Sequence, residues 1–146
     1  TLILLLSIWM TSPKAQAVHL WVVGPENKIY LNTEVDPLLI KTQRSVGALS
    51  IDVFTQMRLP FKGYESGILE INGLGNLIAV DSHQVMRYYG WCYTLNGRLS
   101  ENMPDQTFVQ YPNDQIVWFY GYAMQDDNGN WQQCLPANDA IPNERY

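Results

Sequence analysis

The chain has few cations and few side chains that bind transition metals. Among its 146 residues it carries nine Lys and Arg against 14 Asp and Glu, for a formal net charge of −5, and it has two His. No stripe of Lys and Arg is present to bind nucleic-acid phosphates, and the excess of acid repels them. Two His without clustered Cys are too few ligands for a structural zinc site. The composition therefore argues against a nucleic-acid binder and against a zinc-built domain.

The chain also lacks an apolar run that would cross a bilayer as a helix. Its most apolar stretch, Thr1 to Met10, has about ten residues, half of the roughly 20 that a span needs. Ala15-Gln16-Ala17 follows with the small-x-small pattern of a signal-peptidase site. We therefore expect residues 1–17 to be a signal peptide, the mature chain to begin near Val18 without a membrane span, and the protein to be periplasmic or extracellular. A buried N-terminal helix is the alternative, although Pro13 interrupts it.

Cysteine is scarce too, since Cys92 and Cys134 are the two copies. In an exported protein they are expected to form a disulfide. Closing a loop of about 43 residues would stabilise the fold by about 4 kcal/mol on the chain-entropy model. Two unrelated buried thiols are the alternative. Neither Cys has a His near it in sequence that would activate it as a nucleophile.

Residues 18–146 fit a single domain, and their strongest local pattern is a helix. Apolar side chains recur at helical spacing from Val46 to Met57, with Ser45 as the N-cap and Pro60 as the stop. The other patterns are short and typical of strands. The expected strands are 18–23, 28–31, 38–41, 67–71, 77–80, 90–95, 107–110 and 116–120. One helix among many short strands predicts the α+β class.

Two Asn-Gly pairs, Asn72-Gly73 and Asn96-Gly97, follow strand patterns. Asn and Gly accept the positive φ angles of a type I′ turn, so each pair predicts a β-hairpin. The strand at 116–120 is apolar on both faces, which predicts that both faces are packed. Residues 124–146 are rich in Asn, Asp, Gln and Pro, and we expect an irregular C-terminal tail that Cys134 ties back to the domain.

The middle of the chain has a distinctive aromatic pattern. It reads Gly90-Trp91-Cys92-Tyr93-Thr94-Leu95-Asn96-Gly97 and continues, after a polar loop, with Pro112-Asn113-Asp114-Gln115-Ile116-Val117-Trp118-Phe119-Tyr120. This pattern resembles the transcobalamin-like C-terminal domain family, and the resemblance covers residues 18–123. It implies a β-grasp-like mixed sheet of about five to six short strands packed on one main helix. In vitamin-B12 carriers this module forms one wall of the corrinoid site, so a corrinoid is the ligand that the resemblance implies.

Aromatic side chains are plentiful, with five Trp and nine Tyr. One interpretation is a stacking surface for a flat ligand or a sugar. The other is sheet core, because aromatic residues favour half-buried pleated surfaces. Trp91, Tyr93, Trp118 and Tyr120 are expected in the core, and the strand-end tyrosines Tyr88, Tyr89 and Tyr122 are the candidates for exposure. The candidate ligand-binding residues are Tyr88, Tyr89, Trp91, Tyr93 and Tyr122.

No motif in the sequence supports catalysis or metal binding. Asp81-Ser82-His83 puts the residue types of a triad side by side, but neighbours on an extended chain point apart. Residues 126–130 begin like a calcium loop, yet Trp131 stands where the sharp turn needs Gly and Ala137 where a bidentate Glu belongs. We therefore expect no enzyme, no catalytic residue and no metal site.

Two functions fit these observations. The first is a non-catalytic exported module that binds a small flat or amphipathic ligand, or an envelope protein, across an aromatic sheet face. The second is a structural or protein-interaction domain of the cell envelope without a small-molecule ligand. A cluster of exposed tyrosines favours the first function, and burial of these tyrosines favours the second.

Overall fold

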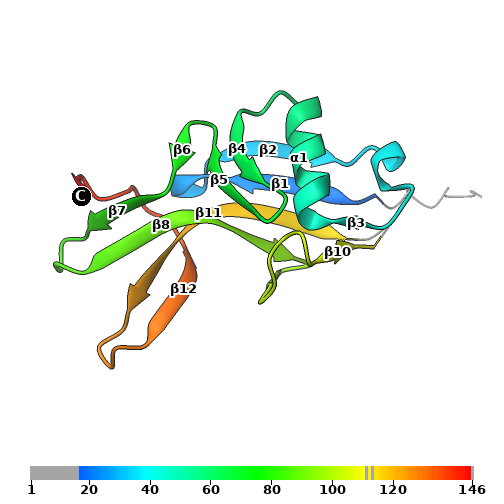
Figure 1. Cartoon of the computed structure of the whole chain (residues 1–146). Coiled ribbons are helices and arrows are strands. Elements are labelled where there is room, and N and C mark those ends of the chain that lie inside the picture. Colours follow the sequence, from blue (N-terminus) through cyan, green and yellow to red (C-terminus); the bar gives the residue numbers. More distant parts are fainter. Residues whose placement is uncertain (1–16, 111, 113, 146) are drawn as a thin grey trace, which may run out of the picture.

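The structure, a computed structural model, describes residues 17–110, 112 and 114–145. The signal peptide expected at residues 1–17 lies outside the described residues, apart from Ala17. The described part is rich in strands and has one α-helix, which confirms the α+β class (Figure 1). Within it, every helix is too short or too polar to cross a membrane.

The elements are mostly short, as the local patterns predict. In chain order they are β1 (His19–Val23), the 3-10 helix η1 (Pro25–Asn27), β2 (Ile29–Glu34), the 3-10 helix η2 (Pro37–Ile40), β3 (Arg44–Ser45), α1 (Val46–Gln56), β4 (Phe61–Tyr64), β5 (Gly67–Ile71), β6 (Leu74–Gly75), β7 (Leu77–Val80), β8 (Met86–Leu95), β9 (Arg98–Leu99), β10 (Phe108–Val109), β11 (Gln115–Gln125), β12 (Trp131–Pro136) and β13 (Glu144–Arg145).

The main sheet is mixed and curled, and in the described residues it has eight strands instead of the expected five to six (Figure 1). Its order is β13-β7-β8-β11-β1-β2, with β12 also beside β11 and β9 beside β8. The β1–β11 pair is parallel, whereas β11 is antiparallel to β8 and to β12. β11 is therefore the centre of the sheet, since it pairs with β8 along one edge and with β1 and then β12 along the other. Two small sheets, β10-β3 and β4-β5-β6, complete the fold.

Helix α1 begins where the sequence predicts. The backbone N–H of Ala48 donates a hydrogen bond of 3.1 Å to the hydroxyl of Ser45, which gives one otherwise unpaired donor of the first turn a partner. The apolar side of the helix then packs on one face of the main sheet. Members of the shared core cluster include Leu49, Val53, Phe54, Leu20, Val22, Ile116 and Trp118. Trp118 and Tyr120 are each 1% exposed, which confirms that they belong to the core.

Both Asn-Gly turns form as predicted. Asn72 and Gly73 have φ angles of 52° and 80°, and Asn96 and Gly97 have φ angles of 53° and 77°. The second turn is also tied to the start of β11, because the backbone N–H of Gln115 donates to the side-chain oxygen of Asn96 at 2.8 Å. The turn chemistry thus sets the register of β8 against β9.

Two local predictions are wrong. Residues 38–41 were expected to be a strand, but they lie in and just after the 3-10 helix η2. The side chain of Asp36 accepts a hydrogen bond from the backbone N–H of Leu38, and this local bond favours a turn over a strand. The tail at 124–146 is also not irregular throughout, because it contains β12, which pairs with β11, and β13, which pairs with β7. β12 forms a hairpin with β11 across residues 126–130, whereas β13 depends on pairing with β7, which is distant in the sequence.

Candidate functional site

The two faces of the main sheet are covered to different extents. Figure 1 shows α1 and the small β4-β5-β6 sheet on one side of it; we call this side the covered face and the other the open face. Side chains alternate between the faces along a strand. On β8, Tyr89 and Trp91 therefore point to the covered face, and Tyr88 and Gly90 point to the open face.

The covered face carries a row of packed aromatic rings. Tyr89 stacks on Tyr120 with ring centroids 5.6 Å apart, and it lies 5.4 Å from the ring of Tyr122. Trp91 meets Tyr120 edge-on at 5.3 Å, and its indole N–H donates a 2.7 Å hydrogen bond to the carbonyl of Leu74. Such pairs add to the stability that burial gives, so these rings act first as core.

Tyr93 continues the row further along β8. Its ring lies 5.3 Å from Trp118, and its hydroxyl donates a 2.7 Å hydrogen bond to the carbonyl of Asn102. Both ends of the side chain are therefore engaged in internal contacts.

The structure places the five candidate ligand-binding residues in different environments. Tyr88 is 40% exposed, Tyr89 and Tyr93 are 5% and 8% exposed, and Trp91 and Tyr122 are half-buried. The expectation that the strand-end tyrosines form one exposed cluster is therefore wrong for Tyr89. Its ring belongs to a second core cluster with Ala137, against which Ile141 packs. The C-terminal segment thus buries Tyr89, which was expected to be a candidate for exposure.

A hollow of about 710 Å³ lies beside β8, and we call it the first hollow. Four of the five candidate residues line it, namely Tyr88, Tyr89, Trp91 and Tyr122; Tyr93 is not part of its lining. The structure therefore brings most of the candidate residues to one place, although the rings of Tyr89, Trp91 and Tyr122 pack together on the covered face.

Two glycines that face each other across β8 and β11 shape the first hollow. Gly90 pairs with Gly121, and both line the hollow. A Cβ atom on Gly90 would lie 2.9 Å from the side-chain oxygen of Asn76, and one on Gly121 would lie 2.9 Å from the backbone oxygen of Leu135. Glycine is needed at position 121, where the neighbour is backbone, whereas at position 90 the neighbour is the end of a side chain that can move aside. The hollow consequently combines the ring of Tyr88, on the open face, with the amide groups of Asn76 and Gln133.

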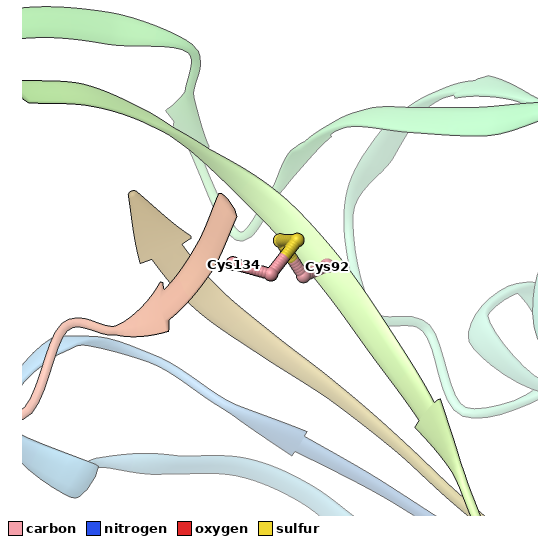
Figure 2. Close-up of a disulfide and its surroundings, with 2 residues drawn as sticks. All are labelled: Cys92 and Cys134. Carbon is pink, nitrogen blue, oxygen red and sulfur yellow. A yellow bond between two sulfur atoms is a disulfide. The ribbon is translucent and has the colours of Figure 1, made fainter. Parts of the chain in front are cut away.

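The predicted disulfide forms a wall of the same hollow. Figure 2 shows Cys134 of β12 bonded to Cys92 of β8, and their Cα atoms are 5.9 Å apart. The pairing of β12 with β11 shifts between Tyr122 and Met124, and Cys134 has a φ of 55°. This bulge turns β12 toward β8, which brings the two sulfur atoms together.

A charged pair lies beside the aromatic row of the covered face. The guanidinium of Arg87 is 4.4 Å from the ring centroid of Tyr122, and it donates a 3.1 Å hydrogen bond to the carboxylate of Asp81. The pKa of Asp81 is lowered, chiefly because the backbone N–H of Val85 donates to its carboxylate, although burial opposes this effect. The pKa of Arg87 is raised: burial acts to lower it, and contacts with Tyr89, Tyr122 and Asp81 outweigh that effect. The cation thus helps to orient Tyr122.

The carboxylates of Asp81 and Asp126 accept hydrogen bonds from the backbone of their own turns. The carboxylate of Asp81 accepts hydrogen bonds from the backbone N–H groups of His83 and Val85, so it organises a turn instead of orienting the His83 ring. Asp126 similarly accepts from the backbone of Asn128 and Asn130. Among the described residues, no three His, Cys, Asp or Glu side chains gather where they would hold a metal ion.

Sequence reasoning missed three contributors to this region. Trp131 is 53% exposed and lies edge-on to Tyr88, with ring centroids 5.6 Å apart. It was missed because residues 124–146 were expected to be irregular. Gly90 and Gly121 were missed as well, although glycine inside a strand is a known signal of a close backbone approach.

The fold and the hollow together define an α+β domain with an aromatic and amide-lined pocket on a mixed sheet. No family model matches the chain, and no curated protein matches it. Among solved structures, the chain is similar to that of a candidate metal-binding protein from Ruminococcus gnavus, with 19% sequence identity over 73% of this chain and 99% of the other, and a TM-score of 0.43. At that TM-score the likeness supports no inference about fold or ligand.

Proposed function

We propose that this domain is a non-catalytic, exported binding module that takes a small flat ligand into the first hollow. The observation that carries the proposal is the hollow itself. Its volume of about 710 Å³ falls within the ~300–1,000 Å³ of ligand pockets. Its lining combines the ring of Tyr88 with the amides of Asn76 and Gln133, which suits a ligand that has a flat apolar surface and a hydrogen-bonding edge.

The exposed rim of the hollow supports the same proposal. Tyr88 lines the hollow and keeps 40% of its surface exposed, and Trp131 stands beside it. Tyr and Trp side chains give a large contact area at low entropic cost, because they have few rotatable bonds. The ring of Tyr88 is therefore the first contact that a ligand entering from the open face would make.

The resemblance to the transcobalamin-like C-terminal domain selects the first ligands to test. We propose that the chain is a relative of that family with a β-grasp-like fold. The packing of α1 on one face of a mixed sheet supports this classification. Corrinoids are accordingly the first ligands to screen, followed by smaller flat aromatic compounds.

Export is part of the proposal. It is supported by the apolar run and Ala15-Gln16-Ala17 in the sequence, and by the disulfide, since disulfides persist in oxidising compartments. N-terminal sequencing of the secreted or periplasmic product tests it. A product that starts near Val18 agrees with export, and a product that retains Leu4 contradicts the predicted cleavage.

A structural or protein-interaction domain of the cell envelope is the second candidate function. It is favoured by the burial of Tyr89 and Tyr93, which uses two candidate ligand residues as core. It also fits the exposed Met86, Tyr88 and Trp131, which are 42%, 40% and 53% exposed and would contact an envelope protein. In this case no small molecule would bind the first hollow.

Thermal unfolding in the presence of corrinoids and flat aromatic compounds separates the two functions. A ligand that binds only the folded protein stabilises it by roughly 2.7 kcal/mol at 100 times its Kd, so the melting temperature rises with ligand concentration. The variant Ala123→Phe would fill the hollow from the open face, where Ala123 pairs with Tyr88 across the sheet, and should abolish the shift.

Tyr64→Ala is the matched control, because Tyr64 is 73% exposed on β4 and does not line the hollow. It should leave the ligand-induced shift unchanged. If no flat compound raises the melting temperature of the native protein, the structural function becomes the better account. If a compound does so equally well with Ala123→Phe, it binds elsewhere and the proposed site is wrong.

A further inference from the structure

The open face of the sheet holds a second hollow of about 470 Å³. Its apolar lining comes from β1, β9, β11 and β12, with the side chains Val23, Leu99, Val117, Phe119, Leu135 and Pro136. Leu99 is 50% exposed, and Val117 and Phe119 are half-buried. The sequence predicts that both faces of β11 are packed, yet the described chain leaves these open-face side chains partly in water. Covering them with an apolar group would be favourable.

The two hollows adjoin at the bulge of β12. Gln133 and Cys134 line both of them, so the Cys92–Cys134 bridge lies at their boundary. The linings differ in chemistry. The first hollow has the ring of Tyr88 and the amide of Asn76, whereas the lining of the second is dominated by aliphatic side chains and Phe119. A single molecule lying over the bulge would therefore meet a polar, aromatic region at one end and an apolar region at the other.

We propose that the ligand of this domain is amphipathic, with a flat hydrogen-bonding head in the first hollow and an unbranched apolar chain in the second. This inference rests on the proposed function, because it names the ligand class of the same site. Among the described residues, no Asp, Glu, Lys or Arg side chain lines either hollow, and the chain as a whole has a net charge of −5. A neutral head is favoured over an anionic one, since an anion would be repelled and would find no cation in the lining.

A series of 4-alkylphenols tests this ligand class. Phenol, 4-ethylphenol, 4-butylphenol and 4-hexylphenol share one flat head with one hydroxyl and differ in chain length. Calorimetric titration of the full domain should show a Kd that falls by about fourfold for each added methylene, the factor that corresponds to ~0.8 kcal/mol per buried CH₂. The decrease should stop once the second hollow is filled.

Two variants locate the head and the chain. Leu99→Gln places an amide in the wall of the second hollow and should remove most of the dependence on chain length while phenol binds as before. Leu69→Gln is the matched control, because Leu69 is also 50% exposed but lies on β5 and lines neither hollow. Ala123→Phe fills the first hollow and should weaken phenol and the alkylphenols alike.

Each failure has a distinct pattern. If phenol or another flat compound binds the first hollow but the alkyl chain adds nothing, the amphipathic ligand is wrong and the proposed function stands. If chain length matters equally in Leu99→Gln and Leu69→Gln, the chains bind non-specifically and the inference is overturned. If chain length matters but Ala123→Phe has no effect, the second hollow acts alone, which also overturns it. If no flat compound and no alkylphenol binds, the inference and the proposed function both fail.

Discussion

A single hydrogen bond inside the core can determine how strongly the substitution of one residue destabilises the fold. The indole N–H of Trp118 donates a 2.8 Å hydrogen bond to the hydroxyl of Ser50 on α1, and these residues are 1% and 0% exposed. This bond joins the helix to the central strand of the sheet at a place without access to water. A buried donor that loses its acceptor keeps its full desolvation cost, so both partners matter together.

We predict that Ser50→Ala destabilises the fold by about 1–3 kcal/mol, because it leaves the indole N–H of Trp118 unpaired. Urea unfolding measures the change. The same substitution at Thr55, an exposed residue of α1 whose hydroxyl donates to the carbonyl of Ile51, should cost less than about 1 kcal/mol. A double-mutant cycle with Trp118→Phe should show coupling, since phenylalanine has no N–H to leave unpaired. Additive effects in this cycle would contradict the role of the bond.

Asp81 makes stability depend on pH. Its pKa is lowered in the fold, chiefly by the hydrogen bond from the backbone N–H of Val85, with His83 and Arg87 also contributing. A carboxylate with a lowered folded-state pKa adds stability above its unfolded pKa of about 3.9, and this stability is lost as the pH falls through the folded pKa. We predict that Asp81→Asn lowers stability at pH 7 and flattens the decline of stability below about pH 4. The free energy of urea unfolding between pH 2 and pH 7, with Asp127→Asn as an exposed control, measures this effect. Parallel curves for the native protein and Asp81→Asn would rule it out.

At the scale of elements, the sequence correctly predicted the helix and the tight turns, because each of these is determined by residues within one short segment. The helix at 46–56 has its apolar spacing and its Ser45 cap within one segment, and the Asn96-Gly97 turn carries its own backbone preference. β12 forms a hairpin with β11 at Asn128-Gly129, where Gly129 has a φ of 80°, and the bond to the distant Cys92 also holds it. The candidate site was therefore predicted in part. Tyr88 was correctly expected to be exposed, but the burial of Tyr89 depends on the C-terminal segment, which packs there through long-range contacts.

The disulfide should be the main support of β12. The two cysteines are 42 positions apart, and closing a loop of this size stabilises the fold by about 4 kcal/mol on the chain-entropy model. We predict that replacing both Cys92 and Cys134 by Ala lowers the melting temperature and increases hydrogen exchange first in β12, which pairs with β11 alone. Exchange measured by NMR or mass spectrometry locates the change. Unchanged protection of 131–136 would show that strand pairing holds β12 without the bridge.

At the scale of the whole molecule, the two faces of the main sheet have different tasks. The covered face is packed by α1 and by the C-terminal segment, and its aromatic row runs from Tyr89 to Trp118. The open face carries the two hollows and the exposed pair Tyr88 and Trp131. Neighbouring residues on one strand therefore have different roles, one in core packing and the next on the open face, because alternate side chains point to opposite faces.

Tyr88 and Tyr89 test this division, since they are adjacent on β8 and chemically identical. We predict that Tyr89→Ala costs about 3–5 kcal/mol, the range for removing a large buried ring, because it takes away the stacking with Tyr120 and leaves a cavity in the core. Tyr88→Ala should change stability by less than about 1 kcal/mol, as an exposed side chain, while it weakens ligand binding by about 1–3 kcal/mol. Urea unfolding and calorimetric titration with the best ligand of the thermal screen give the two quantities. Equal losses of stability in both variants would mean that something covers the open face at Tyr88, and the binding site would then have to lie elsewhere on the molecule.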